Sequence, residues 1–126
     1  MLDVYSGREN PNWNLTSSEE ETFLKSLQAL NRTETEFAST GLGYRGFIVE
    51  GTGLKGYDRV SVYKGVVLAQ AGESSSRFED RDRSLERWLF GTGKDSLDRD
   101  LYVQILSEIE MNQTTAKESA AKASML

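Results

Sequence analysis

Apolar residues recur along this chain with two different periods, and these periods predict the elements of a small fold. A spacing of three or four residues predicts a helix over residues 17–30. The apolar positions that carry this spacing are Phe23, Leu24, Leu27 and Leu30. Thr16 or Ser17 is expected to open the helix, and Glu20, three positions after Ser17, completes a capping box.

Two more helices are predicted in the second half of the chain. Asp80 or Asp82 caps the first, which ends at Gly91, and Asp95 or Ser96 caps the second. Their apolar positions also recur at helical spacing, so one face of each helix is expected to be buried. These positions are Leu85, Trp88 and Leu89 in the first helix and Leu97, Leu101, Ile105 and Ile109 in the second.

Alternation of apolar and polar residues predicts the strands. It marks a short strand over residues 2–6, a second over 44–50 and the strongest one over 59–70. Gly65 interrupts the last of these and indicates either a hairpin turn or a bulge; we favour one long, bulged strand. Residues 71–78 are rich in Gly and Ser and are expected to form a loop.

The predicted order of elements is β-α-β-β-α-α, which indicates an α+β fold. We expect a small, mainly antiparallel sheet of three or four strands with about three helices packed on one face. Residues 1–111 are expected to form a single globular domain. Residues 112–126 lack bulky apolar side chains until the last two positions, so we expect a flexible tail there.

Length and charge narrow the function classes. The chain has 126 residues, which fits one domain, and its 15 Lys and Arg against 20 Asp and Glu give a net charge of −5. An acidic chain is not expected to bind nucleic acid, because phosphate backbones require positive surface. The longest apolar stretch is far too short to span a membrane, and no secretory signal is recognised, so we expect a cytoplasmic protein without a membrane partner.

The absence of two residue types limits the chemistry further. The chain contains no Cys and no His. It therefore has no thiol nucleophile, no zinc-thiolate site and no imidazole base. We assign no catalytic residue and lean towards a protein that is not an enzyme. Two matches to G-x-G-x-x-G, at 41–46 and 51–56, precede strands rather than helices, so they indicate turns and not a dinucleotide site.

The loop after the first predicted strand is the best candidate for a ligand site. It combines Arg and Glu with three Asn, one Pro and one Trp. Arg can clamp a carboxylate or phosphate, and Trp offers a rigid apolar plate. An alternative of similar weight is that Trp13 seals the core while Arg8 and Asn10 hold the loop backbone. The predicted ligand-binding residues are Ser6, Arg8, Glu9, Asn10, Asn12, Trp13 and, from another loop, Asp58.

The same loop carries a resemblance. Ser6-Gly7-Arg8-Glu9-Asn10-Pro11-Asn12-Trp13, followed by Leu15, resembles an SGRPNPxWxL pattern of small uncharacterised bacterial proteins, cyanobacterial ones among them. Glu9 stands where the pattern has Pro, which departs from a rigid double-proline turn. The resemblance implies a compact α+β protein of the bacterial cytoplasm and no particular activity.

Three functions remain in competition. The leading hypothesis is a binding or interaction module whose partner is a small ligand or a protein. No cofactor is expected under it. The second is a protein that binds a divalent metal ion through carboxylates. Its candidate ligands are Glu9, Asp58, Asp80 and Asp82.

The third hypothesis is a His-free acid/base enzyme that uses a carboxyl group with a raised pKa. A Glu or Asp, for example Asp58, together with Tyr57 or Tyr63 would carry such chemistry. A homodimer is a further alternative for the assembly, because a small sheet with an exposed edge can pair with a second copy.

Overall fold

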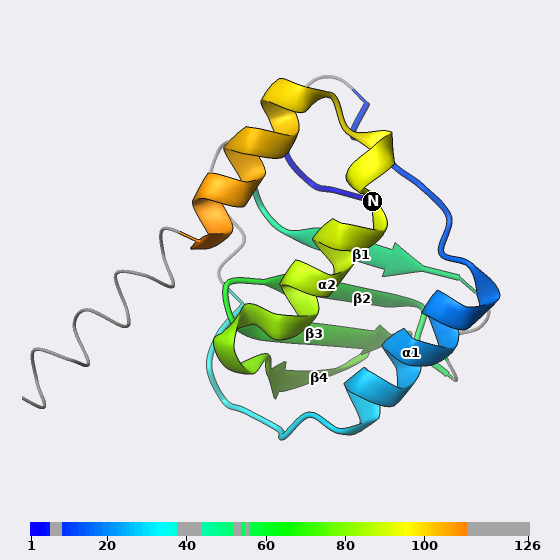
Figure 1. Cartoon of the computed structure of the whole chain (residues 1–126). Helices are drawn as coiled ribbons and strands as arrows, with labels where there is room; N and C mark the ends of the chain where they lie inside the picture. The colour runs from blue at the N-terminus through cyan, green and yellow to red at the C-terminus, as the bar shows by residue number, and fades with distance from the viewer. Residues whose placement is uncertain (6–8, 38–43, 52–53, 55, 111–126) are drawn as a thin grey trace, which may run out of the picture.

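A four-stranded antiparallel sheet with helices on one face forms the fold (Figure 1). The computed structural model of the chain describes residues 1–5, 9–37, 44–51, 54 and 56–110. The α+β architecture predicted from the sequence is therefore confirmed. The predicted tail lies outside the described residues.

The four strands follow one another in the sheet in the order of the chain. They are β1 (Phe47–Glu50), β2 (Arg59–Tyr63), β3 (Val66–Ala71) and β4 (Ser74–Glu79), each antiparallel to its neighbour. Cross-strand partners share a face, so the register gathers the apolar residues on the side of the helices. The buried side chains on that face are Phe47, Val60, Val62, Val67 and Ala69.

A tight turn separates β2 from β3, so the prediction of one long, bulged strand is wrong. Lys64 and Gly65 form a two-residue connection, and φ is positive at both, +52° and +86°. Two positive φ angles in succession are the mark of a type I′ hairpin turn, whose twist matches that of the flanking strands. Lysine rarely adopts this conformation, so the residue type at position 64 does not signal the turn.

The predicted loop over 71–78 is also wrong, because β4 occupies most of it. Gly72, with φ +60°, opens a second two-residue turn, and Ser74 then pairs with Ala71. The strand is polar because it lies near the sheet edge, and its stability comes from the backbone ladder with β3 rather than from apolar side chains.

The helix α1 (Ser17–Gln28) has Thr16 as its N-cap. This is one residue before Ser17, the cap of the predicted capping box. Thr16 Oγ1 accepts the amide of Glu19 at 3.1 Å, and the Glu19 carboxylate accepts the amide of Thr16 at 2.9 Å. The capping box is therefore Thr16–Glu19 and not Ser17–Glu20. The predicted inward face is confirmed at Phe23 and Leu27, which are buried.

The second helix, α2 (Ser84–Thr92), follows a short 3₁₀ turn, η1 (Arg81–Arg83). The N-cap position is Arg83 rather than Asp80 or Asp82. The Asp80 carboxylate, three residues before it, nevertheless accepts the first-turn amides of Leu85 and Glu86 at 2.8 and 3.1 Å. The predicted end at Gly91 is one residue short.

A last helix covers residues 99–110 of the described chain and follows the 3₁₀ turn η2 (Lys94–Ser96). The predicted caps Asp95 and Ser96 belong to η2, and the amide of Leu101 is instead bound by Asp98 Oδ1 at 2.8 Å. The predicted apolar stripe is confirmed at Leu101, Ile105 and Ile109, which are buried in the core, whereas Leu97 precedes the helix and is only partly buried.

The N-terminal segment runs beside β1 but forms a single bridge, not the strand predicted over 2–6. Leu2 bridges Phe47, the amide of Asp3 donates to Gly46 O at 2.8 Å, and Ile48 donates to Met1 O at 2.8 Å. The amides of Val4 and Tyr5 instead donate to the side chain of Asn10, which ends the pairing with β1.

The opposite edge of the sheet is covered in the same way. Arg32 bridges Phe78 of β4, and the amide of Thr33 donates to Arg77 O at 3.0 Å. Short segments therefore lie along both outer strands. None of the helices in the described ranges is long and apolar enough to cross a membrane.

Candidate functional site

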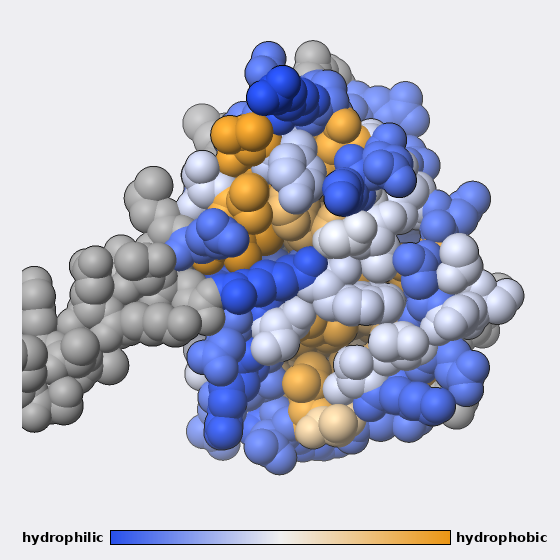
Figure 2. Space-filling model, viewed as in Figure 1, coloured by the Kyte–Doolittle hydropathy of each residue, from blue (hydrophilic) through white to orange (hydrophobic). Residues whose placement is uncertain are grey.

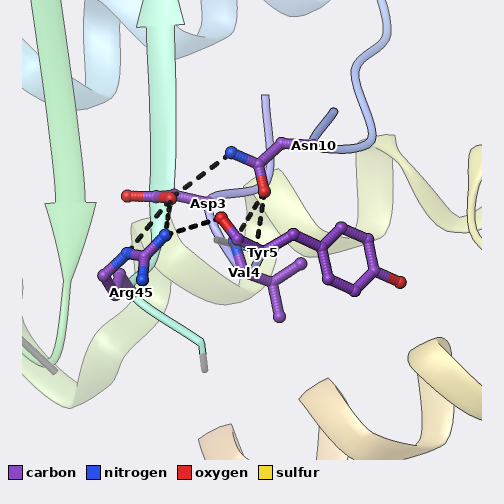
Figure 3. Close-up of polar contacts among 5 residues, drawn as sticks. All are labelled: Asp3, Val4, Tyr5, Asn10 and Arg45. Atoms are coloured by element: carbon purple, nitrogen blue, oxygen red, sulfur yellow. Dashed lines mark hydrogen bonds and ion pairs between the residues drawn. The ribbon is translucent and has the colours of Figure 1, made fainter. Parts of the chain in front are cut away.

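Asn10 closes the loop that the sequence singled out. Its Oδ1 accepts the amides of Val4 and Tyr5 at 3.0 and 2.8 Å, and its Nδ2 donates to Asp3 Oδ1 at 3.4 Å (Figure 3). One amide side chain thus replaces the backbone partners that a continuing strand would have supplied. It holds the loop against the N-terminal segment.

An ion pair fixes that segment from the other side. Arg45 Nη2 lies 2.8 Å from Asp3 Oδ1 and donates to Tyr5 O at 2.9 Å, as Figure 3 shows. The Asp3 and Arg45 side chains are only 19% and 16% exposed, so water screens the pair less than a surface pair. The loop is therefore tied to the residues that precede β1.

Trp13 anchors the other end of the loop on α2. Its indole N–H donates to Thr92 Oγ1 at 2.9 Å, and its ring meets that of Phe47 edge to face at 6.1 Å. The ring also lies directly over Gly93. Trp13 therefore connects the loop, the sheet and the end of α2.

A pocket of about 410 Å³ opens beside Trp13, between the loop, the first turn of α1 and β1. We call it the Trp13 pocket. Its floor is formed by Phe47, Leu54 and Leu89, which are each only 2% exposed, while the exposed part of its lining is more polar than apolar. The polar groups that line it are the side chains of Asn12, Asn14, Glu20 and Glu50 and the Met1 amino group.

The charged groups of the Trp13 pocket differ in how they are compensated. Glu50 pairs with Arg59 at 3.0 Å, and the Met1 amino group donates to Ile48 O at 2.8 Å. Burial lowers the pKa of the Met1 amino group, while the charge of Glu50 opposes that shift. No hydrogen bond or ion pair joins the half-buried Glu20 carboxylate to any residue that the structure describes.

A second, more open pocket of about 410 Å³ lies on the other side of the loop. Glu9, Asn10 and Asn12 line it together with Leu97 and Asp98, which lead into the last helix. The structure thus brings Glu9, Asn10, Asn12 and Trp13 into one wall between two pockets. Ser6 and Arg8 lie outside the described residues.

Asp58 is not part of this wall. It directly precedes β2, and its Oδ2 accepts the amide of Gly72 at 2.6 Å. Asp58 lines neither of the two pockets beside the loop, and it holds the turn between β3 and β4.

The carboxylates proposed as metal ligands are also spread over the fold. Glu9 lies in the loop, Asp58 holds a turn, Asp80 accepts first-turn amides of α2, and Asp82 lies in η1. Among the residues with a described position, no group of three or more His, Cys, Asp or Glu is placed to hold a metal ion.

Sequence reasoning missed a buried polar cluster around Glu86, which is 0% exposed. Arg83 Nε and Nη2 donate to its two oxygens at 2.8 and 2.6 Å, and the Lys64 amide donates to Oε1 at 2.8 Å. The Tyr44 hydroxyl donates to Oε2. The i, i+3 spacing of Arg83 and Glu86 was the only visible signal, and a charge run at a helix start is usually solvated.

The electrostatics of this cluster favour a structural role. Burial, followed by the charge of Glu86 and the hydrogen bond to it, raises the pKa of Tyr44 far above its ordinary value, so the phenol stays protonated. Burial would lower the pKa of Arg83, but Glu86 outweighs it and raises that pKa. The Arg83 guanidinium and the Glu86 carboxylate form an ion pair at 2.6 Å inside the core.

Comparisons with known proteins add no relative. No known protein family matches the chain, and neither curated proteins nor solved structures give a match. The function must therefore be argued from the geometry of the site itself.

Proposed function

We propose that this chain is a non-catalytic binding module of the cytoplasm that takes a small ligand in the Trp13 pocket. The observation that carries the proposal is the pairing of an apolar floor with a polar rim on a rigidly held loop. Small-ligand sites are typically concave and about 300–1,000 Å³ in volume, with a few placed polar groups, and the Trp13 pocket has this size.

The contacts that hold the pocket in place favour a ligand-binding role for the loop over a purely structural one. Asn10 and Trp13 fix the two ends of the loop by hydrogen bonds, whereas Asn12 between them is exposed and lines the pocket. A site whose walls are fixed before the ligand arrives loses less conformational entropy on binding. Asn12 is then the group that meets the ligand, and Asn10 is a positioning residue.

A fragment screen tests this proposal. A library of neutral, cationic and anionic fragments would be screened by ligand-observed NMR, and hits mapped on amide spectra of the labelled protein. We expect hits that shift Trp13, Phe47 and Leu89. Asn12→Ala should weaken them, while Asn31→Ala, which removes an exposed amide side chain at the opposite sheet edge, should not.

Trp13→Phe provides a second variant, because it keeps an aromatic wall and removes only part of the contact. Circular dichroism would verify that each variant is folded. The proposal is wrong if no fragment shifts the pocket residues, or if every hit binds Asn12→Ala and Trp13→Phe as tightly as the original chain.

A further inference from the structure

We propose that the ligand of the Trp13 pocket is a small organic amine, bound as its ammonium ion with the charge at Glu20 and the apolar body on the floor. This inference rests on the proposed function and names the ligand class for the same site. It is carried by charge complementarity at the rim and by the composition of the wall.

Glu20 is the charged side chain of this rim that is left without a partner among the described residues. Its carboxylate is half-buried in the first turn of α1, where an ion pair is screened less than on the open surface. An ammonium donates three hydrogen bonds and carries the opposite charge, so it complements this group better than a neutral donor does.

The same helix start disfavours an anion, although helix N-termini often bind anions. The capping box uses the amides of Thr16 and Glu19, and the amide of Glu20 donates to Thr16 O at 2.8 Å. The carboxylates of Glu19 and Glu20 already complement the positive end of the helix. An anion in the pocket would meet the like charge of the Glu20 carboxylate.

The Met1 ammonium does not replace the proposed ligand. Its hydrogen bond goes to Ile48 O, and the carboxylate that acts on its charge is Glu50. Glu50 is itself shared with Arg59. The negative charge of Glu20 is therefore uncompensated by either cation.

The wall and floor fit the rest of such a molecule. Phe47, Leu54 and Leu89 offer an apolar floor, and Trp13 adds an aromatic wall that its hydrogen bond to Thr92 keeps in place. A carboxylate beside an aromatic ring is a common arrangement for ammonium recognition, because the ring face also attracts cations. The ligand is thus expected to join one amine to a ring-sized or branched apolar group.

Three probes of one size separate charge from shape: phenethylamine, 2-phenylethanol and 3-phenylpropionate. Trp88→Phe leaves Trp13 as the single tryptophan, since the chain has two, so its fluorescence reports on the pocket. The Trp13 indole N–H signal in the NMR spectrum of the unmodified chain gives the same readout without a substitution. Titrations at pH 7 and low salt compare the three affinities.

We expect phenethylamine to bind about tenfold more tightly than 2-phenylethanol, and 3-phenylpropionate to bind most weakly, as one charge-assisted contact implies. Glu20→Gln should lower the affinity for phenethylamine about tenfold and leave that for 2-phenylethanol unchanged. Glu21→Gln is the matched control, because it removes the same charge from the same helix outside the pocket lining. It should change neither affinity.

Equal or stronger binding of the alcohol or the acid, with no effect of Glu20→Gln, overturns the assignment of an ammonium ligand and leaves the proposed binding function standing. Failure of all three probes to bind also overturns it. The binding function falls with it only if the broader fragment screen finds no ligand in the pocket either.

Discussion

The ring of Trp13 occupies the space that a side chain at position 93 would need. A Cβ built on Gly93 would lie 2.2 Å from Trp13 Cζ2, far inside van der Waals contact. The backbone of Gly93 has φ −102°, which any residue adopts, so this glycine serves close approach and not an unusual conformation. The close contact between Trp13 and Gly93 connects the loop to the end of α2.

Gly93→Ala is therefore expected to displace Trp13 and to lower the free energy of unfolding by about 1–3 kcal/mol, as overpacking does elsewhere. Urea denaturation followed by circular dichroism measures the loss, and tryptophan fluorescence reports the moved ring. Gly91→Ala is the control, because a Cβ there meets nothing within 4 Å and Gly91 is helical. It should stabilise the chain by about 0.4–1 kcal/mol. Equal effects of the two substitutions would contradict this relationship.

Asn10 and Asn12 are predicted to separate stability from binding. Asn10→Ala leaves the amides of Val4 and Tyr5 without their acceptor and should cost about 1–3 kcal/mol of unfolding free energy. Asn12→Ala removes an exposed side chain and should change stability by less than about 0.5 kcal/mol. Thermal and urea unfolding measure both. A stable Asn10→Ala variant would show that the loop is held by other contacts.

The Glu86 cluster is predicted to be the most sensitive polar site of the fold. Glu86→Gln keeps the size of the side chain but leaves the buried Arg83 charge without its partner, which should cost about 3–5 kcal/mol. Tyr44→Phe removes one donor to the same carboxylate and should cost less, about 1–3 kcal/mol. Glu34→Gln, at an exposed position, is the control for loss of one negative charge. If Glu86→Gln unfolded at the same urea concentration as the control, the cluster would not contribute to the stability of the fold.

Asp80 is predicted to show a pH dependence opposite to that of most surface carboxylates. Burial raises its pKa above the ordinary 3.8, although the amides of Leu85 and Glu86 act in the other direction. A carboxyl group that binds its proton more tightly when folded contributes stability that is complete below 3.8 and is lost as the pH rises through the raised pKa. The contribution of Asp80 should therefore grow on acidification.

Comparison with Asp80→Asn, which cannot titrate, isolates this contribution. The difference in unfolding free energy between the original chain and the variant should shift in favour of the original as the pH falls from about 7 to about 3. A carbon-detected NMR titration should place the Asp80 midpoint above 3.8. A difference that stays constant, or that shifts in the other direction, would disagree with the burial of this group.

Local patterns were enough for the fold class and the helices. Phe23 and Leu27 in α1, and Ile105 and Ile109 in the last helix, are buried where helical spacing placed them. The strands of the sheet are harder to predict from the sequence, because hydrogen bonds between backbones define them and the side-chain pattern is a weaker signal. Lys64 adopts a positive φ that its residue type disfavours, and β4 needs few apolar side chains when β3 supplies its hydrogen bonds.

The sequence predicts the contacts of the candidate site only where the contacting residues are close to one another along the chain. The loop could be recognised from its own composition, and Asn10 binds the amides of residues five and six positions away. The partner of Trp13 lies 79 positions away, at Thr92, and the Tyr44 donor to Glu86 lies 42 positions away. No local pattern encodes such contacts, because they depend on how the helices pack on the sheet.

The surface on the helix side has both hydrophilic and apolar areas. Figure 2 shows apolar areas over the last helix and lower on the same face, bordered by hydrophilic residues. Val103, at 52% exposure, is the large apolar residue most open to solvent in the described part of the chain. Single exposed apolar side chains are normal on monomeric proteins.

The segments along the two outer strands affect how a second copy of this chain could pair with the edges of the sheet. An unpaired strand edge is a template for intermolecular sheets and, in the extreme, for fibrils. Here the residues around Leu2 and around Arg32 already use part of the hydrogen-bonding capacity of β1 and β4. A second copy that adds a strand beside β1 must first displace the N-terminal segment, against the Asp3–Arg45 pair and Asn10. The pairing that such a strand would gain is therefore offset by the contacts it must break.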